Sequence, residues 1–147
     1  VEEALKSKLV PGFELYSNIA REQNVAVDFK VDFILSGPQG DCLLEVKSAT
    51  AVEDGLASYP NSLTPRGVKQ LKHLTRKALE GQRSVLLFLI QRADVNSFSV
   101  SNSYDLAYAE AFDIAVASGV EVIAMSVSVS REGFGNPKVI PHIVKVG

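Results

Sequence analysis

Three charged residues interrupt two otherwise apolar segments, and their types and spacing could support phosphodiester hydrolysis. Asp32 lies in the first segment, and Glu45 and Lys47 lie in the second. Two carboxylates held close together repel each other, and a divalent cation between them removes that repulsion. Mg²⁺ (or Mn²⁺) prefers oxygen ligands, so Asp32, Glu45 and the backbone carbonyl of Val46 are candidate ligands. Lys47 beside the cation could orient an attacking water or stabilise a negatively charged transition state, which makes all three charged residues candidate catalytic residues.

The elements that must position these residues form a predicted β-hairpin that turns at Pro38-Gln39. Apolar and other side chains alternate along both strands, as expected where one face of a sheet is buried. The apolar residues expected on one shared face are Val31, Phe33, Leu35, Cys42, Leu44 and Val46. The most symmetric register that keeps them together sets Asp32 opposite Glu45. Lys47 then falls on the same face as Glu45, opposite Lys30.

The same charges have a simpler explanation, which the pattern by itself favours. Charged residues on one face of a hairpin usually form its solvated face, and diagonal ion pairs between Lys30 and Glu45 or between Asp32 and Lys47 would be unremarkable. An aspartate followed by Glu-x-Lys is a short pattern with common chance matches. The residue types therefore leave a metal site and a solvated face both open.

The remaining pattern predicts one α/β domain with a mixed central β-sheet flanked by helices. The 147 residues are 46% hydrophobic and 22% charged, which is typical of a globular domain with a buried core. A strand meander followed by crossover helices implies a mixed sheet. Besides the hairpin, the expected elements are a helix at 1–9, a strand near 24–29, a helix at 62–81 capped by Thr64, a strand at 84–91, a helix at 104–119 capped by Ser103, a strand at 120–129 and an edge segment at 138–146. Residues 51–62 show no clear periodicity and predict a loop.

Composition narrows the function classes. The single cysteine, Cys42, excludes an internal disulfide and a multi-cysteine metal site. No segment has the roughly 18 apolar residues that a membrane span needs, and no signal peptide is visible, so we expect no membrane partner. A reduced, single-cysteine domain has the cytoplasm as its default location, or an organelle stroma if a transit peptide was removed. The net charge of −2 means that nucleic-acid binding would require a local basic patch.

The predicted helix at 62–81 carries such a patch as a stripe opposite its apolar face. The residues that recur there at helical spacing are Arg66, Lys69, His73, Arg76 and Lys77. A cationic stripe on a slightly acidic protein is what contact with a phosphate backbone requires. A solvated surface helix would show the same pattern, so the stripe alone does not decide between the two.

A longer pattern resembles a known family. The chain contains, in this order, the stretches VDFIL, CLLEVKSAT, YPNSLTPRGVKQLKHL, EGQRSVLLFLIQR and YAEAFDIAVASGVEVIA, followed by SREG. In order and spacing these stretches resemble the sugar fermentation stimulation protein A (SfsA) family. The resemblance runs from about Val1 to Gly133. It implies a PD-(D/E)XK restriction-endonuclease-like core that spans 1–147 as a single domain, with Mg²⁺ as cofactor and DNA as partner. We expect the family's N-terminal OB-fold to be absent from this chain.

The resemblance also assigns roles to individual positions. It places Asp32 on the family's metal-binding aspartate and the pair Glu45 and Lys47 on its ExK. Glu3 aligns with an acid on the first helix, where many PD-(D/E)XK domains have a further metal-binding carboxylate, and Glu22 is a rival for that role. The chain departs from the usual residues at three places: Phe29-Lys30 stands where the family usually has Ser-Arg, Gln70 replaces a histidine, and Asn61 replaces an aspartate. Lys30 joins the basic stripe in the set expected to contact DNA.

Two functions follow from the resemblance. The first is a Mg²⁺-dependent nuclease that uses Asp32, Glu45 and Lys47. The alternative is a non-catalytic DNA-binding module that regulates genes of sugar metabolism, as the family name suggests. A homodimer fits either function, because many nuclease-like domains pair to reach two strands.

Overall fold

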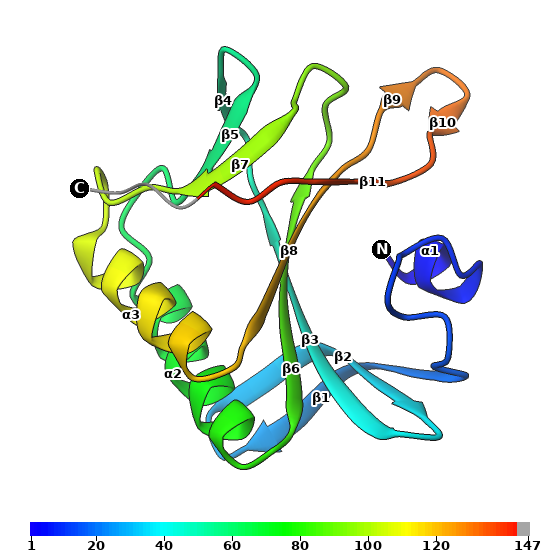
Figure 1. The fold of residues 1–147 in the computed structure, drawn as a ribbon, viewed down its shortest axis with the longest axis vertical. Helices are drawn as coiled ribbons and strands as arrows, with labels where there is room; N and C mark the ends of the chain where they lie inside the picture. The colour runs from blue at the N-terminus through cyan, green and yellow to red at the C-terminus, as the bar shows by residue number, and fades with distance from the viewer. Residues whose placement is uncertain (144–147) are drawn as a thin grey trace.

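A mixed six-stranded sheet crosses the molecule in the computed structural model, which describes residues 1–143 (Figure 1). In sheet order its strands are β1 (Asn18–Ala26), β2 (Phe29–Gly37), β3 (Gly40–Ser48), β6 (Arg83–Ile90), β8 (Glu121–Ser126) and β11 (Lys138–Ile140). β1, β2 and β3 are antiparallel neighbours, β3, β6 and β8 are parallel, and β11 runs antiparallel to β8. The predicted mixed sheet is therefore confirmed, with the segment at 138–146 contributing an edge strand; its residues 144–146 lie outside the described residues.

Helices cover the sheet from both sides (Figure 1). α2 (Pro65–Leu79) and α3 (Leu106–Ala117) pack together against one face, and the short α1 (Glu2–Lys6) lies on the other. The Thr64 side chain accepts a hydrogen bond from the Gly67 N–H, so Thr64 caps α2 as predicted. The cap of α3 differs from the prediction: Asp105, rather than Ser103, accepts the Tyr108 N–H at 3.1 Å. None of the helices in residues 1–143 has the length and apolar character to cross a membrane.

Short strands account for most of what the sequence pattern missed. The expected loop at 51–62 contains the hairpin of β4 (Ala51–Glu53) and β5 (Leu56–Tyr59), and β7 (Ser97–Val100) pairs in parallel with β5. β9 (Val129–Ser130) and β10 (Gly133–Phe134) form a second small hairpin. Strands of two to four residues are too short to show a clear alternation of apolar and polar side chains.

Two hydrophobic clusters lie on opposite faces of the sheet. On β6, Phe88 belongs to the cluster under α2 and α3, and Leu87 belongs to the cluster near α1, so both faces of this strand are buried. Val31 packs in the first cluster, although we expected it beside Phe33, which lies in the second. The change of face falls where β2 gains its second neighbour, because β2 pairs with β3 only from Phe33 onward and its first half pairs with β1 alone.

Candidate functional site

The hairpin of β2 and β3 has the predicted register. Phe33 pairs with Leu44 and Gly37 pairs with Gly40, so the next step of the same register sets Asp32 across from Glu45. The ladder of backbone pairs ends there, and the Asp32 side chain bridges to β3 instead. Its Oδ2 atom accepts a hydrogen bond from the Val46 N–H at 2.8 Å. Asp32 is thereby anchored to β3 beside Glu45.

Glu45 is a buried acid with an unsatisfied oxygen. Its side chain is 2% exposed, and its Oε2 atom has no hydrogen-bond partner among the described residues. Burial, followed by hydrogen bonding and charge repulsion from Asp32, raises the pKa of Glu45 from 4.5 to about 9, although Lys47 and Arg66 act in the opposite direction. Without a cation, Glu45 therefore carries a proton at neutral pH. Two adjacent carboxyl groups, one buried and incompletely bonded, fit the ligand preference of a hard divalent cation.

Lys47 lies next to this acid pair and is held by α2. Its Nζ atom donates a hydrogen bond to Oε1 of Gln70. Burial lowers the pKa of Lys47, and the charges of Glu45 and Asp32 partly offset that effect. The sequence did not identify Gln70 as a site residue. Two signals were available: Gln70 replaces a histidine that the family usually has, and it lies four residues after Arg66, which places both side chains on one face of α2.

The structure brings neither Glu3 nor Glu22 into a metal-binding group with Asp32 and Glu45. No set of three or more His, Cys, Asp or Glu side chains in residues 1–143 is arranged to hold a metal ion. α1 lies on the other side of the sheet (Figure 1), and its residue Glu3 lines a cavity of about 390 Å³ there. Glu22 lies on β1 between Arg21 and Gln23, which pair with Phe33 and Val31, but it is exposed and has a φ of 50°. The predicted third carboxylate is therefore not found in the described residues.

Four of the six residues expected to contact nucleic acid line one groove beside the acid pair. The groove has a volume of about 330 Å³ and lies between α2 and the β1–β2 turn. Its four predicted members are Lys30, Arg66, Lys69 and His73. Arg76 and Lys77 do not line it, because they lie roughly 15 Å farther along α2 than Arg66, at a rise of about 1.5 Å per residue. Lys77 instead pairs with Glu80 at 3.5 Å.

Asp105 holds the N-terminus of α2 in place, and Arg66 lies in the first turn of that helix. Its Oδ2 atom accepts the Thr64 N–H at 2.8 Å, while its Oδ1 atom caps α3. The helices approach closely at Gly67, where a Cβ atom would lie 2.6 Å from Thr64 Oγ1 and 3.1 Å from the Tyr108 ring. One buried carboxylate and one glycine thus hold the first turn of α2 over the site.

The protonated state of Glu45 predicts that the cation-free protein loses stability as pH rises. Because the pKa of Glu45 is higher in the folded state, the unfolded chain binds fewer protons between pH 4.5 and about 9. The free energy of unfolding should fall across this window by at most about 1.4 kcal/mol per pH unit. Glu45→Gln, which resembles the protonated acid, should remove this contribution. Urea unfolding in EDTA at several pH values measures the difference, and identical pH dependences for the two proteins would contradict it.

Comparison with known proteins places the chain in a family. Residues 1–133 match the family model described as "Sugar fermentation stimulation protein RE domain". The sugar fermentation stimulation protein homolog of Ruegeria pomeroyi is 39% identical over 132 residues, which cover 88% of this chain and 57% of that protein. The homolog of Brucella ovis is 36% identical over 142 residues, which cover 95% of this chain and 60% of that protein.

A solved structure gives the same assignment. The structure of Pyrococcus furiosus SfsA in complex with Ca²⁺ is 26% identical and superposes with a TM-score of 0.90, covering 99% of this chain and 62% of that chain. The match confirms the predicted nuclease-like α/β fold. The chain spans about three fifths of the length of these relatives. It belongs to the sugar fermentation stimulation protein (SfsA) family.

Proposed function

We propose that this domain binds DNA and hydrolyses its phosphodiester bonds with a Mg²⁺ or Mn²⁺ ion held by Asp32, Glu45 and the backbone carbonyl of Val46. The observation that carries the proposal is the buried Glu45, which lies against Asp32 with one oxygen unpartnered. Such a pair is costly in a structural role, because a buried polar atom without a partner loses its hydration. A divalent cation would neutralise both acids and use the free oxygen.

The Pyrococcus furiosus relative supports divalent-cation binding by a protein of this family. Its structure is described as a complex with Ca²⁺. Ca²⁺ and Mg²⁺ are both hard cations that bind carboxylate and carbonyl oxygens, although Mg²⁺ keeps more of its waters. Two protein carboxylates and one carbonyl would therefore suffice for Mg²⁺ here.

The residues around the acid pair suit hydrolysis of a phosphodiester. A bound cation of this kind neutralises phosphate charge and lowers the pKa of its water. Lys47, fixed by Gln70, is placed to orient that water or to stabilise the negative charge that develops on the phosphate. Arg66 lies near enough to influence the pKa of both Glu45 and Lys47, so it adds a second cation on the side of the groove.

The alternative is a module that binds DNA without cutting it. The observation that favours it is the missing third acidic ligand in residues 1–143, which leaves the cation with few protein contacts. Its role would be regulatory, as the name sugar fermentation stimulation protein suggests. Lys47 favours catalysis, because a site that only binds has no need for a lysine held beside paired acids.

Incubation with circular single-stranded DNA and with supercoiled plasmid distinguishes the two functions. The proposal predicts cleavage of at least one substrate in Mg²⁺ or Mn²⁺, no cleavage in EDTA, and no cleavage by Glu45→Gln prepared in parallel. The Glu45→Gln protein controls for a contaminating nuclease. DNA that is bound in a gel-shift assay but stays intact in both cations would replace the nuclease with the binding module.

A further inference from the structure

The groove beside the acid pair has two unlike walls. One wall is the two-residue turn between β1 and β2, where Val27 is fully exposed and Asp28 is largely exposed. The other wall is the first half of α2, which contributes Lys69 and His73. At about 330 Å³ the groove is comparable with small-ligand sites, which start near 300 Å³. It therefore has room for a small part of a nucleic acid, but not for the width of a duplex.

Two residues of the groove link it to the candidate catalytic residues, which do not line it themselves. Gln70 lines the groove and accepts the hydrogen bond from Lys47. Arg66 also lines it and lies close to Glu45. A chain that places one phosphodiester at the acid pair would thus place a neighbouring nucleotide in the groove.

The lining offers partners for both parts of a nucleotide. Three cations, Lys30, Arg66 and Lys69, outnumber the single acid, Asp28, so the groove favours a phosphate. His73 is stacked on Phe29 with ring centroids 4.8 Å apart. Burial, and then the nearby charges of Arg76 and Lys69, lower the pKa of His73, which favours the neutral form of its ring. A neutral aromatic wall and the amide of Gln70 suit a base, by stacking and by hydrogen bonding.

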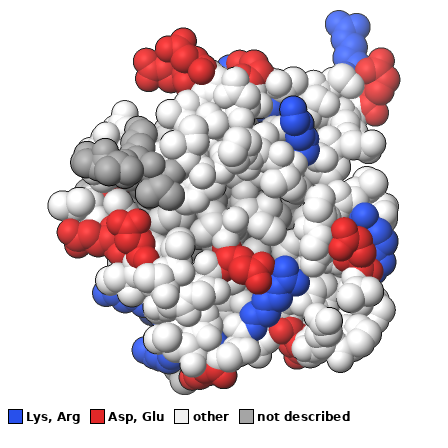
Figure 2. All heavy atoms as spheres, viewed as in Figure 1, with Lys and Arg blue, Asp and Glu red and all other residues white. Residues whose placement is uncertain are grey.

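We propose that this groove binds an unpaired nucleotide next to the cleaved phosphodiester, and that the substrate is single-stranded DNA. The location of the cleaved bond rests on the proposed function. Two observations favour a single strand: the groove is narrow, and Val27 presents an apolar side chain that an unstacked base can contact. Duplex binding needs a continuous cationic surface, and on the face shown in Figure 2 Lys and Arg are interspersed with Asp and Glu.

An ion pair joins the two walls of the groove. Lys69 Nζ lies 3.7 Å from Asp28 Oδ2, and both side chains are more than half exposed. Exposed pairs of this kind contribute little stability, so a phosphate can replace the Asp28 carboxylate at Lys69. Asp28 therefore competes with DNA, and its removal should strengthen binding.

Fluorescence anisotropy tests the proposal with a labelled 12-nucleotide dT oligomer and a 12-base-pair duplex. Measurements in EDTA exclude cleavage and report binding alone. We expect the single strand to bind at least about fivefold more tightly, since a stacked base contributes appreciably to affinity. Lys69→Gln should weaken single-strand binding about three- to tenfold and reduce its salt slope by about 0.7, the value for one lost phosphate contact. Equal or tighter binding of the duplex would overturn the proposal.

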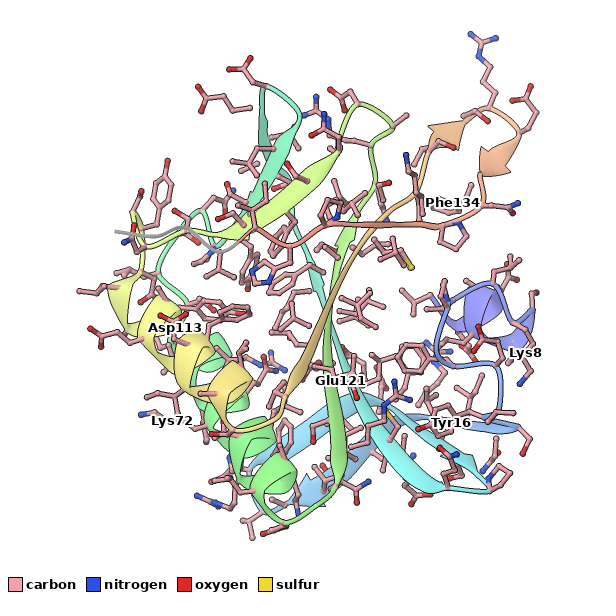
Figure 3. All side chains as sticks on the ribbon, in the orientation of Figure 1. Lys8, Tyr16, Lys72, Asp113, Glu121 and Phe134 are labelled. Atoms are coloured by element: carbon pink, nitrogen blue, oxygen red, sulfur yellow. The ribbon has the colours of Figure 1, made fainter. Side chains whose placement is uncertain are left out.

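Two matched pairs of variants complete the test. Lys72→Gln makes the same change as Lys69→Gln on the outer side of α2, away from the groove (Figure 3), and should leave affinity unchanged within about twofold. Asp28→Asn should raise affinity about two- to fivefold. Asp54→Asn, at the turn between β4 and β5, makes the same charge change outside the groove and should have no such effect. Equal effects within either pair would overturn the groove assignment.

The outcomes separate this proposal from the proposed function. If the groove variants behave as expected but the wild-type protein cuts no DNA, the nuclease is excluded and the groove stands as a DNA-binding site. If cleavage depends on Glu45 but the groove variants bind like the wild type, the groove assignment fails and the nuclease stands.

Discussion

Lys47→Met should reduce DNA cleavage at least about 100-fold while divalent-cation binding stays within about threefold of the wild type. The large effect follows from position: Lys47 lies beside the acid pair, and Gln70 holds its ammonium group. Methionine keeps most of the volume but cannot stabilise charge on a phosphate. The cation ligands are oxygen atoms of other residues, so they remain. In Glu45→Gln, by contrast, both cleavage and cation binding should be lost.

Single-turnover cleavage of a labelled oligonucleotide measures the effect, with cation affinity measured on the same preparations. Lys72→Met is the control, because it makes the same substitution on the outer face of α2 (Figure 3). Gln70→Leu should show a smaller loss than Lys47→Met, since it leaves the ammonium group but removes its acceptor. Wild-type cleavage by Lys47→Met would remove Lys47 from the catalytic site.

The placement of Asp32 across from Glu45 could be predicted because it depends only on strand alternation and on the position of the turn. Side chains alternate along a strand, and a turn at Pro38-Gln39 leaves one symmetric register. The same rules could not show that Glu45 is buried. That burial comes from α2 and α3, which cover this face of the sheet, and their placement depends on contacts between distant segments (Figure 1).

Side-chain contacts between helices and strands could not be predicted from the sequence. Gln70 meets Lys47, and Asp105 meets Thr64, across separations of 23 and 41 residues. No periodicity reports such contacts. The basic stripe was only partly predictable. Helical spacing places its residues on one side of α2, but it does not show which of them line the groove. The β1–β2 turn lies opposite the first half of α2, so Lys69 lines the groove and Lys77 does not.

Glu3 illustrates a limit of alignment by position. An acid on the first helix was expected near the metal, but α1 packs on the far face of the sheet from α2 (Figure 1). The type and sequence position of Glu3 are compatible with a place on either face of the sheet. The structure therefore narrows the candidate ligands in residues 1–143 to Asp32, Glu45 and the carbonyl of Val46.

Proton release on cation binding tests whether Asp32 and Glu45 form a divalent-cation site. Carboxylate ligands must be deprotonated to bind a metal. Because the pKa of Glu45 is raised to about 9, binding at pH 7 must displace its proton. Calorimetric titration with Mg²⁺ or Mn²⁺, in buffers of different ionisation enthalpy, counts the protons released.

We expect one cation bound per chain, about one proton released at pH 7, and an apparent affinity that rises up to about tenfold per pH unit until pH 9. Glu45→Gln should abolish binding, whereas Glu3→Gln, a matched change on the other side of the sheet, should leave it unchanged. Cation binding that releases no proton and survives Glu45→Gln would contradict the account.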